Sequence, residues 1–250
     1  MPSARTHAER VIVLDHTKLA EQDLILTMLA RDGKRLRAVA KGGRKPGGRL
    51  AGRCDLFCED DVLLARGRGS LEIVSEAALV DAHATLRDDL DRMSCASAIC
   101  EVARHSCFED AADPYVHPIT SRALAACEEA ADRAHLDLVS AAYAFKLLAH
   151  EGWRPELEGC VGCGDLAATR FSASAGGVLC ESCASSVEGA EPISPSQLGW
   201  LRALLALTFS ELLAADVDPE TGAFLASLAH VWATTQLDVR LRAFEFALSV

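Results

Sequence analysis

The most constraining feature of this sequence is a pair of Cys-x-x-Cys motifs. The first runs from Cys160 to Cys163, the second from Cys180 to Cys183, and sixteen residues separate them. Two such motifs at this separation are typical of one tetrahedral zinc ion held by four thiolates. Two disulfides or a thioredoxin-like redox pair are the alternatives, but a single zinc site accounts for both motifs at once. Four thiolates leave no open coordination position, so we expect one structural Zn²⁺ and no catalytic role for it.

Residues 157–187 are therefore expected to form a zinc ribbon. Between the two motifs, Phe171 and the pair Gly176-Gly177 lie where a short hairpin would fold back.

The first 80 residues have the pattern of a small β domain. Strands are expected near 10–14, 23–31, 35–41, 61–66 and 70–77, with a turn at 67–69. Asp32-Gly33 is a strong two-residue hairpin signal between the second and third strands. Along the third strand apolar and cationic residues alternate, which puts the apolar set on the core face and the cations on the other face. Five strands in this length suit a closed barrel of the OB type.

Positive charge is concentrated in one short stretch of an acidic protein. The chain carries −11, yet residues 31–53 carry +8, which leaves −19 for the rest. Such a stretch indicates contact with a polyanion, because a merely solvated face would have acidic residues interspersed. The candidate DNA-binding residues lie just before and on the third strand and on the glycine-rich loop after it, which we expect to be mobile: Lys34, Arg35, Arg37, Lys41, Arg44, Lys45 and Arg49. Phe57 is the only aromatic residue among the first 80, so binding should rely on phosphates rather than on base stacking.

Beyond about residue 86 the apolar pattern becomes helical. Helices are expected near 86–107, 118–133 and 136–151, and after the ribbon near 194–214 and 219–248. Ser194 and Gln197 form a capping box at the start of the fourth helix. On the last helix Phe224, Leu228, Val231 and Trp232 are expected on the buried side. The predicted fold is α+β, with a small β-barrel (OB-fold) at 1–80 and an all-helical domain at 81–250 that carries the inserted four-cysteine zinc ribbon.

Other functional classes find little support in the sequence. The glycine-rich loop lacks the ending of a phosphate-binding P-loop, and no nucleophile elbow is present. The histidines show no His-x-x-x-His pair and are expected at the surface or hydrogen-bonded in helices. No apolar run could span a membrane, and no secretory leader is expected behind residues 1–5. Of the six further cysteines, Cys95, Cys100, Cys107 and Cys127 are expected to be mostly small core residues in a reducing cytoplasm. Cys54 and Cys58 are not expected to form a second metal site, because no nearby His or Cys completes one.

Three stretches resemble the bacterial recombination mediator family RecO. They are residues 33–45 (GKRLRAVAKGGRK), residues 145–164 (FKLLAHEGWRPELEGCVGCG) and, up to and including the second Cys-x-x-Cys motif, residues 171–172 and 177–183 (FS and GVLCESC). The resemblance implies an N-terminal OB fold, a helical domain with a zinc ribbon, and work in RecF-pathway repair. Family members bind single- and double-stranded DNA, anneal complementary strands, and with RecR help RecA displace single-strand-binding protein.

The family's zinc ligands correspond to Cys160, Cys163, Cys180 and Cys183, and its DNA-binding role corresponds to the basic strand and loop. The resemblance also implies a non-enzymatic cytoplasmic protein associated with the nucleoid, without a small-molecule substrate. A different class of function remains open, in which the zinc ribbon and the acidic helical domain form a protein–protein adaptor. In that case the basic strand would contact only an acidic partner.

Overall fold

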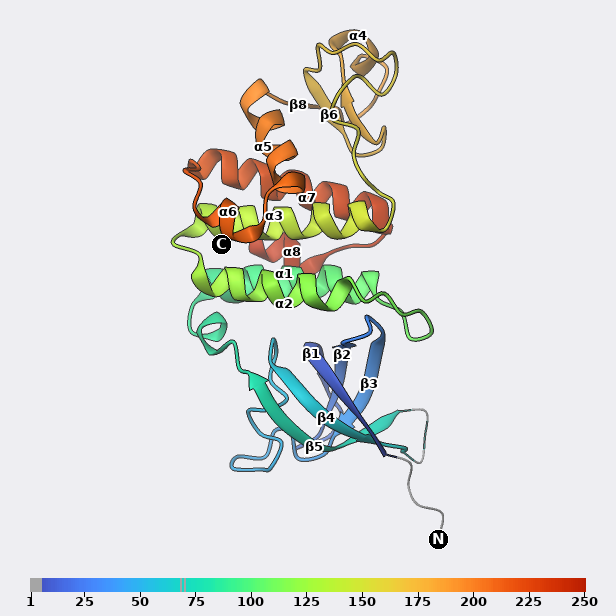
Figure 1. Cartoon of the computed structure of the whole chain (residues 1–250), viewed down its shortest axis with the longest axis vertical. Coiled ribbons are helices and arrows are strands. Elements are labelled where there is room, and N and C mark those ends of the chain that lie inside the picture. Colours follow the sequence, from blue (N-terminus) through green and yellow to red (C-terminus); the bar gives the residue numbers. More distant parts are fainter. Residues whose placement is uncertain (1–5, 68, 70) are drawn as a thin grey trace. The chain divides into compact units, whose positions relative to one another are not determined.

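The computed structural model describes residues 6–67, 69 and 71–250, which form two compact units, Met1–Glu128 and Glu129–Val250 (Figure 1). The fold is α+β, with a sheet near the N-terminus and helices after it, as predicted. The boundary expected at 80/81 falls inside the first unit, at the end of its last strand, and stays a prediction. The N-terminal residues 1–5, the centre of the expected turn at 67–69 and residue 70 of the expected strand 70–77 lie outside the described residues.

Five strands of the first unit close into a barrel in the order β1-β2-β3-β5-β4. Their bounds are β1 Thr6–Lys18, β2 Leu24–Ala30, β3 Arg35–Ala40, β4 Glu59–Ala65 and β5 Glu72–Asp81. β1 is much longer than expected because its two partners pair with different parts of it: its residues from Val11 to Lys18 pair with β2, and those from Thr6 to Ile12 pair with β4. β3 meets β5 in a short parallel pairing.

The hairpin predicted at Asp32-Gly33 is confirmed. Gly33 has a φ of +87° and donates its N–H to the carbonyl of Ala30, while the Ala30 N–H binds the Lys34 carbonyl at 2.8 Å. Glycine is required here for two reasons: the positive φ, and the carbonyl oxygen of Asp113, which would lie 1.8 Å from an added Cβ.

The alternation on β3 also holds. Ala38 and Ala40 are fully buried in the barrel core with residues such as Val11, Met28 and Leu64, whereas Arg37 is exposed. The basic residues of this strand are therefore excluded from the core by the pleat.

A 3₁₀ turn, η1 Ala84–Arg87, and two helices complete the first unit: α1 Leu90–Ser106 and α2 Val116–Glu129. α1 contacts β1 and β2. It begins later than the expected helix at 86 because Asp89 caps it, accepting the Arg92 N–H. All six cysteines outside the Cys-x-x-Cys motifs are buried, which confirms the core position expected for Cys95, Cys100, Cys107 and Cys127.

In the second unit α3 Arg133–His150 packs along α7 Pro219–Leu237 (Figure 1). The ring of Trp232 on α7 lies 6.0 Å from that of Phe145 on α3. The remaining elements are β6 Arg170–Ser172, β7 Gly177–Leu179, α4 Glu181–Ala184, β8 Glu191–Pro192, α5 Pro195–Ala206, α6 Phe209–Leu213 and α8 Arg242–Ala247.

Two long helices expected from the sequence are each divided in two. The one at 194–214 stops at Ala206, because Thr208 starts α6 with its own capping box to Glu211. The one at 219–248 stops at Leu237, because Asp238 adopts a left-handed conformation with φ of +51°. Placing Val231 on the buried side was also wrong: it is 45% exposed, while Trp232 is buried. Among the described residues, none of the helices combines the length and apolarity needed to cross a membrane.

One buried charge stands out in the barrel core. Asp60 on β4 has no exposed surface, and among the described residues neither of its carboxylate oxygens has a hydrogen-bond partner. Burial raises its pKa to about 7, opposed in part by the nearby Arg53.

We therefore expect the barrel to lose stability as pH rises. A carboxyl whose folded pKa exceeds its unfolded value stabilises the fold while protonated, and this stability is lost between the unfolded pKa near 4 and about 7. Relative to Asp60→Asn, the wild-type free energy of unfolding should fall by roughly 2–3 kcal/mol between about pH 5 and about pH 8. Urea denaturation at several pH values measures this.

Asp61→Asn serves as the control, since the exposed Asp61 binds Arg10 and has a lowered pKa. Asp61→Asn should keep the fall in the free energy of unfolding as pH rises from about 5 to about 8. Identical pH profiles for the wild type and Asp60→Asn would contradict the assignment.

Candidate metal centre and nucleic-acid interface

The two Cys-x-x-Cys motifs are held by a small three-stranded sheet in the order β7-β6-β8. β6 and β7 form the hairpin expected between the motifs, with Phe171 opposite Val178. The first motif precedes this hairpin, and the second begins directly after β7 with Cys180 and continues in α4, which contains Cys183. Chain reversal by the hairpin therefore brings the motifs together.

Each Cys-x-x-Cys motif forms a tight backbone turn, called here the first knuckle (Cys160–Cys163) and the second knuckle (Cys180–Cys183). In the first, the Gly164 N–H donates to the Cys160 carbonyl at 2.8 Å; in the second, the Ala184 N–H donates to the Cys180 carbonyl at 3.0 Å. A Cβ on Gly162 would lie 3.0 Å from the Cys183 sulfur. Glycine at this position lets the first knuckle approach the second.

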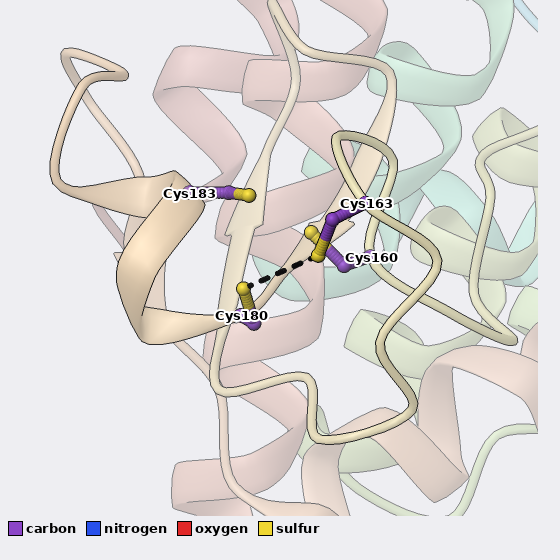
Figure 2. Close-up of side chains that lie close together, drawn as sticks. All are labelled: Cys160, Cys163, Cys180 and Cys183. Atoms are coloured by element: carbon purple, nitrogen blue, oxygen red, sulfur yellow. Dashed lines mark hydrogen bonds between the residues drawn. The ribbon is translucent and has the colours of Figure 1, made fainter.

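The four cysteine sulfurs lie within 4.8 Å of one another, and Figure 2 shows the side chains converging from both knuckles. Across the knuckles, the sulfurs of Cys163 and Cys180 are 3.7 Å apart. Cys160 and Cys180 are buried and Cys163 is exposed. The structure thus gathers all four predicted ligands at one point, as a single-metal site requires.

The electrostatics of this group favour a bound cation. Hydrogen bonds from backbone N–H groups, that of Cys180 first, lower the pKa of Cys160 to about 6. Hydrogen bonding with the neighbouring thiols, Cys163 first, raises the pKa of Cys183 to about 12. Four sulfurs this close cannot all be thiolates unless a positive charge offsets their repulsion. A divalent ion with a preference for sulfur fits that donor set.

The sheet that carries the four cysteines is fixed to the helices of its own unit by apolar and backbone contacts. The ring of Phe171 lies 5.7 Å from that of Trp232 on α7, and the Gln236 side chain donates to the Ala173 carbonyl at 3.1 Å. Gly177 lies so close to the backbone of Glu156, in the segment that precedes the first motif, that an added Cβ would lie 2.2 Å from the Glu156 carbonyl oxygen. The ribbon is therefore packed on the helical unit and does not hang from a free tether.

Three of the seven candidate DNA-binding residues are exposed cations whose side chains make no hydrogen bond or ion pair within the described part of the chain. They are Arg37 on β3 and Lys41 and Lys45 in the segment after it. All of their charge is available to a ligand.

The other four candidates have partners within the protein. Lys34 forms an ion pair with Asp32 at 3.4 Å. Arg35 is half-buried, and its guanidinium donates to the Arg104 carbonyl at the C-terminal end of α1, so this side chain helps to hold the fold and its role in DNA binding stays a prediction. Arg44 and Arg49 remain exposed, but each donates to a barrel carbonyl.

The segment after β3 is a series of hydrogen-bonded turns. The Gly42 N–H binds the Asp23 carboxylate at 2.8 Å, the Arg44 N–H binds the Gln22 carbonyl at 3.0 Å, and the Lys45 N–H binds the Gly42 carbonyl. The glycines predicted a loop here, but no local pattern indicated that its backbone would be fastened to the β1–β2 connection. Mobility of this loop stays a prediction.

The sequence pattern missed one polar cluster, because its members lie far apart along the chain. His83 is buried, and its Nδ1 lies 2.7 Å from Glu128 and 3.8 Å from Asp81. The backbone N–H of His83 binds Asp81, and the Thr85 hydroxyl donates to Glu128 at 2.6 Å. The expectation that His83 lies at the surface or in a helix was therefore wrong. Its side chain connects the end of β5 to the end of α2.

Comparison with known proteins covers nearly the whole chain. The family model described as "Recombination protein O N terminal" matches residues 4–83, and the model described as "Recombination protein O C terminal" matches residues 87–243.

Curated relatives carry the name "DNA repair protein RecO". The one from Desulforudis audaxviator is 29% identical over 244 residues, covering 97% of this chain and 96% of that protein. The one from Bifidobacterium longum subsp. infantis is 36% identical over 212 residues, covering 83% and 85%. The one from Dehalococcoides mccartyi is 32% identical over 196 residues, covering 77% and 76%. By both comparisons, this chain belongs to the recombination protein O (RecO) family.

Proposed function

We propose that the chain is a DNA repair protein that binds single- and double-stranded DNA through its barrel, without catalysing a reaction, and anneals complementary strands. One observation carries this proposal. Exposed cations without side-chain partners among the described residues lie on β3 and in the segment after it, in a chain whose residues outside 31–53 carry −19. Such a local field attracts a polyanion to the barrel and repels it from acidic surface elsewhere.

The topology of the barrel supports an OB-type fold. Its strand order and its parallel β3–β5 pairing are those of a five-stranded Greek-key barrel. OB folds bind oligonucleotides on the face of strands 2 and 3 and with the loop between strands 1 and 2. Arg37 lies on β3, Arg44 contacts the β1–β2 connection at Gln22 and Glu21, and both positions support binding of DNA at that surface.

Recognition should depend on the phosphate backbone. Phe57, the aromatic residue of the barrel segment, is 1% exposed and cannot offer a stacking surface. Because phosphates are common to single and double strands, one basic surface serves both and leaves the bases free to pair.

We further propose that the chain acts with RecR to help RecA replace single-strand-binding protein in RecF-pathway repair, and that it works in the cytoplasm in association with the nucleoid. Support comes from membership of the RecO family and from the acidic remainder of the chain, which leaves surface for protein partners.

For the metal centre we propose one structural Zn²⁺ held by Cys160, Cys163, Cys180 and Cys183. Zinc binds four thiolates tetrahedrally and supplies the positive charge that lets them lie together. No position is then left for a substrate, so the ion's role is to fold the ribbon.

A second function, that of a protein–protein adaptor, is favoured by exposed apolar residues of the ribbon. Leu166 is 81% exposed and Val161 is 43% exposed, in the segment that forms the first knuckle. Apolar side chains exposed to this degree suit contact with a protein.

The DNA proposal predicts the effect of removing the three free cations. Arg37→Ala/Lys41→Ala/Lys45→Ala should weaken binding to any DNA sequence, and should reduce the slope of log K against log salt by about 0.7–0.9 for each phosphate that is no longer bound. Stability should change by less than about 0.5 kcal/mol, since these side chains bind nothing in the described part of the fold. Fluorescence anisotropy of a labelled oligonucleotide at several salt concentrations measures the slope.

The control is Arg122→Ala/Arg154→Ala/Arg242→Ala, which removes the same charge from exposed arginines outside the barrel. It should leave the slope nearly unchanged. Equal losses of DNA affinity in both triple variants would mean that only net charge matters. Unchanged DNA binding by the barrel variant would favour the protein–protein adaptor.

The metal proposal predicts about one zinc per chain by elemental analysis. Cys160→Ser or Cys180→Ser should lose the zinc and lower the melting temperature, because metal binding and ribbon folding are one equilibrium. Cys107→Ala, which alters a buried cysteine outside the cluster, should keep the metal even if it destabilises the protein. A zinc-free protein with an unchanged melting curve would exclude a structural ion.

A further inference from the structure

Three arginines of the basic segment are each fastened to the barrel through one nitrogen. The acceptor in every case is a main-chain carbonyl, and the three bonds are Arg44 Nη1 to Glu21 at 3.0 Å, Arg49 Nη2 to Ser75 at 2.8 Å, and Arg53 Nη1 to Ala77 at 3.1 Å. All three side chains are nevertheless exposed.

Two of these carbonyls belong to β5, just beyond its pairing with β3. That pairing comprises Ala38 with Glu72 and Val39 with Ile73. The carbonyls of Ser75 and Ala77 follow, two residues apart, and the guanidinium groups of the segment donate to them. Where the pairing of β3 with β5 ends, the side chains of Arg49 and Arg53 thus take over as hydrogen-bond donors to β5.

A fastened guanidinium keeps most of its hydrogen-bonding capacity. Arginine has five N–H donors, and in the described part of the chain each of the three uses one nitrogen for its carbonyl bond. The bond fixes the orientation of the planar fork, and phosphate is a ligand for which that fork is suited. An arginine held in this way loses less conformational freedom on binding than a free one.

The geometry points to Arg44, Arg49 and Arg53 as a set of carbonyl-anchored arginines that bind the phosphates of a DNA strand. This inference rests on the proposed DNA-binding function and deepens it. It adds Arg53 to the interface and divides the cations into two kinds. Lys41, Lys45 and Arg37 contribute charge, while the anchored arginines contribute charge and a fixed orientation.

Replacement of arginine by lysine tests the anchoring, since charge is kept and the fork is lost. Arg44→Lys, Arg49→Lys and Arg53→Lys should each weaken single-strand binding by roughly two- to ten-fold, about the worth of one hydrogen bond. The salt slope should stay the same, because the number of cations is unchanged. The matched control is Arg37→Lys, an exposed arginine of the same barrel without a carbonyl partner among the described residues, which should change affinity much less.

Binding is measured by anisotropy well below the melting temperature of each variant, with thermal melts in parallel. The whole 250-residue chain with its metal is used throughout. Losses at the three anchored positions that exceed the loss at Arg37 support the inference. Equal effects at all four positions would overturn it, as would losses that appear only where a variant begins to unfold. If the wild type itself binds no DNA, the proposed function fails, which is a distinct result.

Discussion

Closure of the barrel depends on one long strand whose two partners pair with different parts of it. β1 pairs with β2 along its C-terminal part and with β4 along its N-terminal part, and the two registers overlap at Val11 and Ile12. A strand that must change partner along its length has to bend, and this strand has a register shift between Val13 and Asp15. Pairing of the remaining strands then completes the ring, because in a closed barrel few backbone N–H and C=O groups are left unpaired at a sheet edge. The exception is the short β3–β5 seam, and the basic segment lies against it.

Local signals in the sequence were sufficient where a few neighbouring residues determine the geometry. Asp32-Gly33 predicted the hairpin, and the Cys-x-x-Cys spacing predicted that four sulfurs would meet. In both cases the turn itself positions the groups that matter. Helix ends were less predictable, because Thr208 and Asp238 interrupt apolar patterns that continue past them. A periodicity argument detects the face of a helix more reliably than its end.

Partners that lie far apart in the chain could not be predicted from pattern. The guanidinium of Arg35 binds a carbonyl of α1, 69 residues away, a contact that its charge did not indicate, and its role in DNA binding stays a prediction. His83 and Glu128 are 45 residues apart and meet only because the first unit packs its helices near the end of β5. Charge and alternation show that a side chain leaves the core of the barrel. They do not show whether it then meets solvent or another element of the fold.

The contact between Phe171 and Trp232 also gives the molecule an internal optical reporter. Trp232 is 2% exposed, and its ring lies 6.0 Å from that of Phe145 and 5.7 Å from that of the ribbon's Phe171, whereas Trp153 is 49% exposed and Trp200 is half-buried. If the ribbon detaches from α7, the indole of Trp232 gains water on the side that Phe171 covered, and its emission shifts to longer wavelength. The fluorescence of the unlabelled protein can therefore follow departure of the ribbon separately from the opening of the barrel, since the first 128 residues contain no tryptophan.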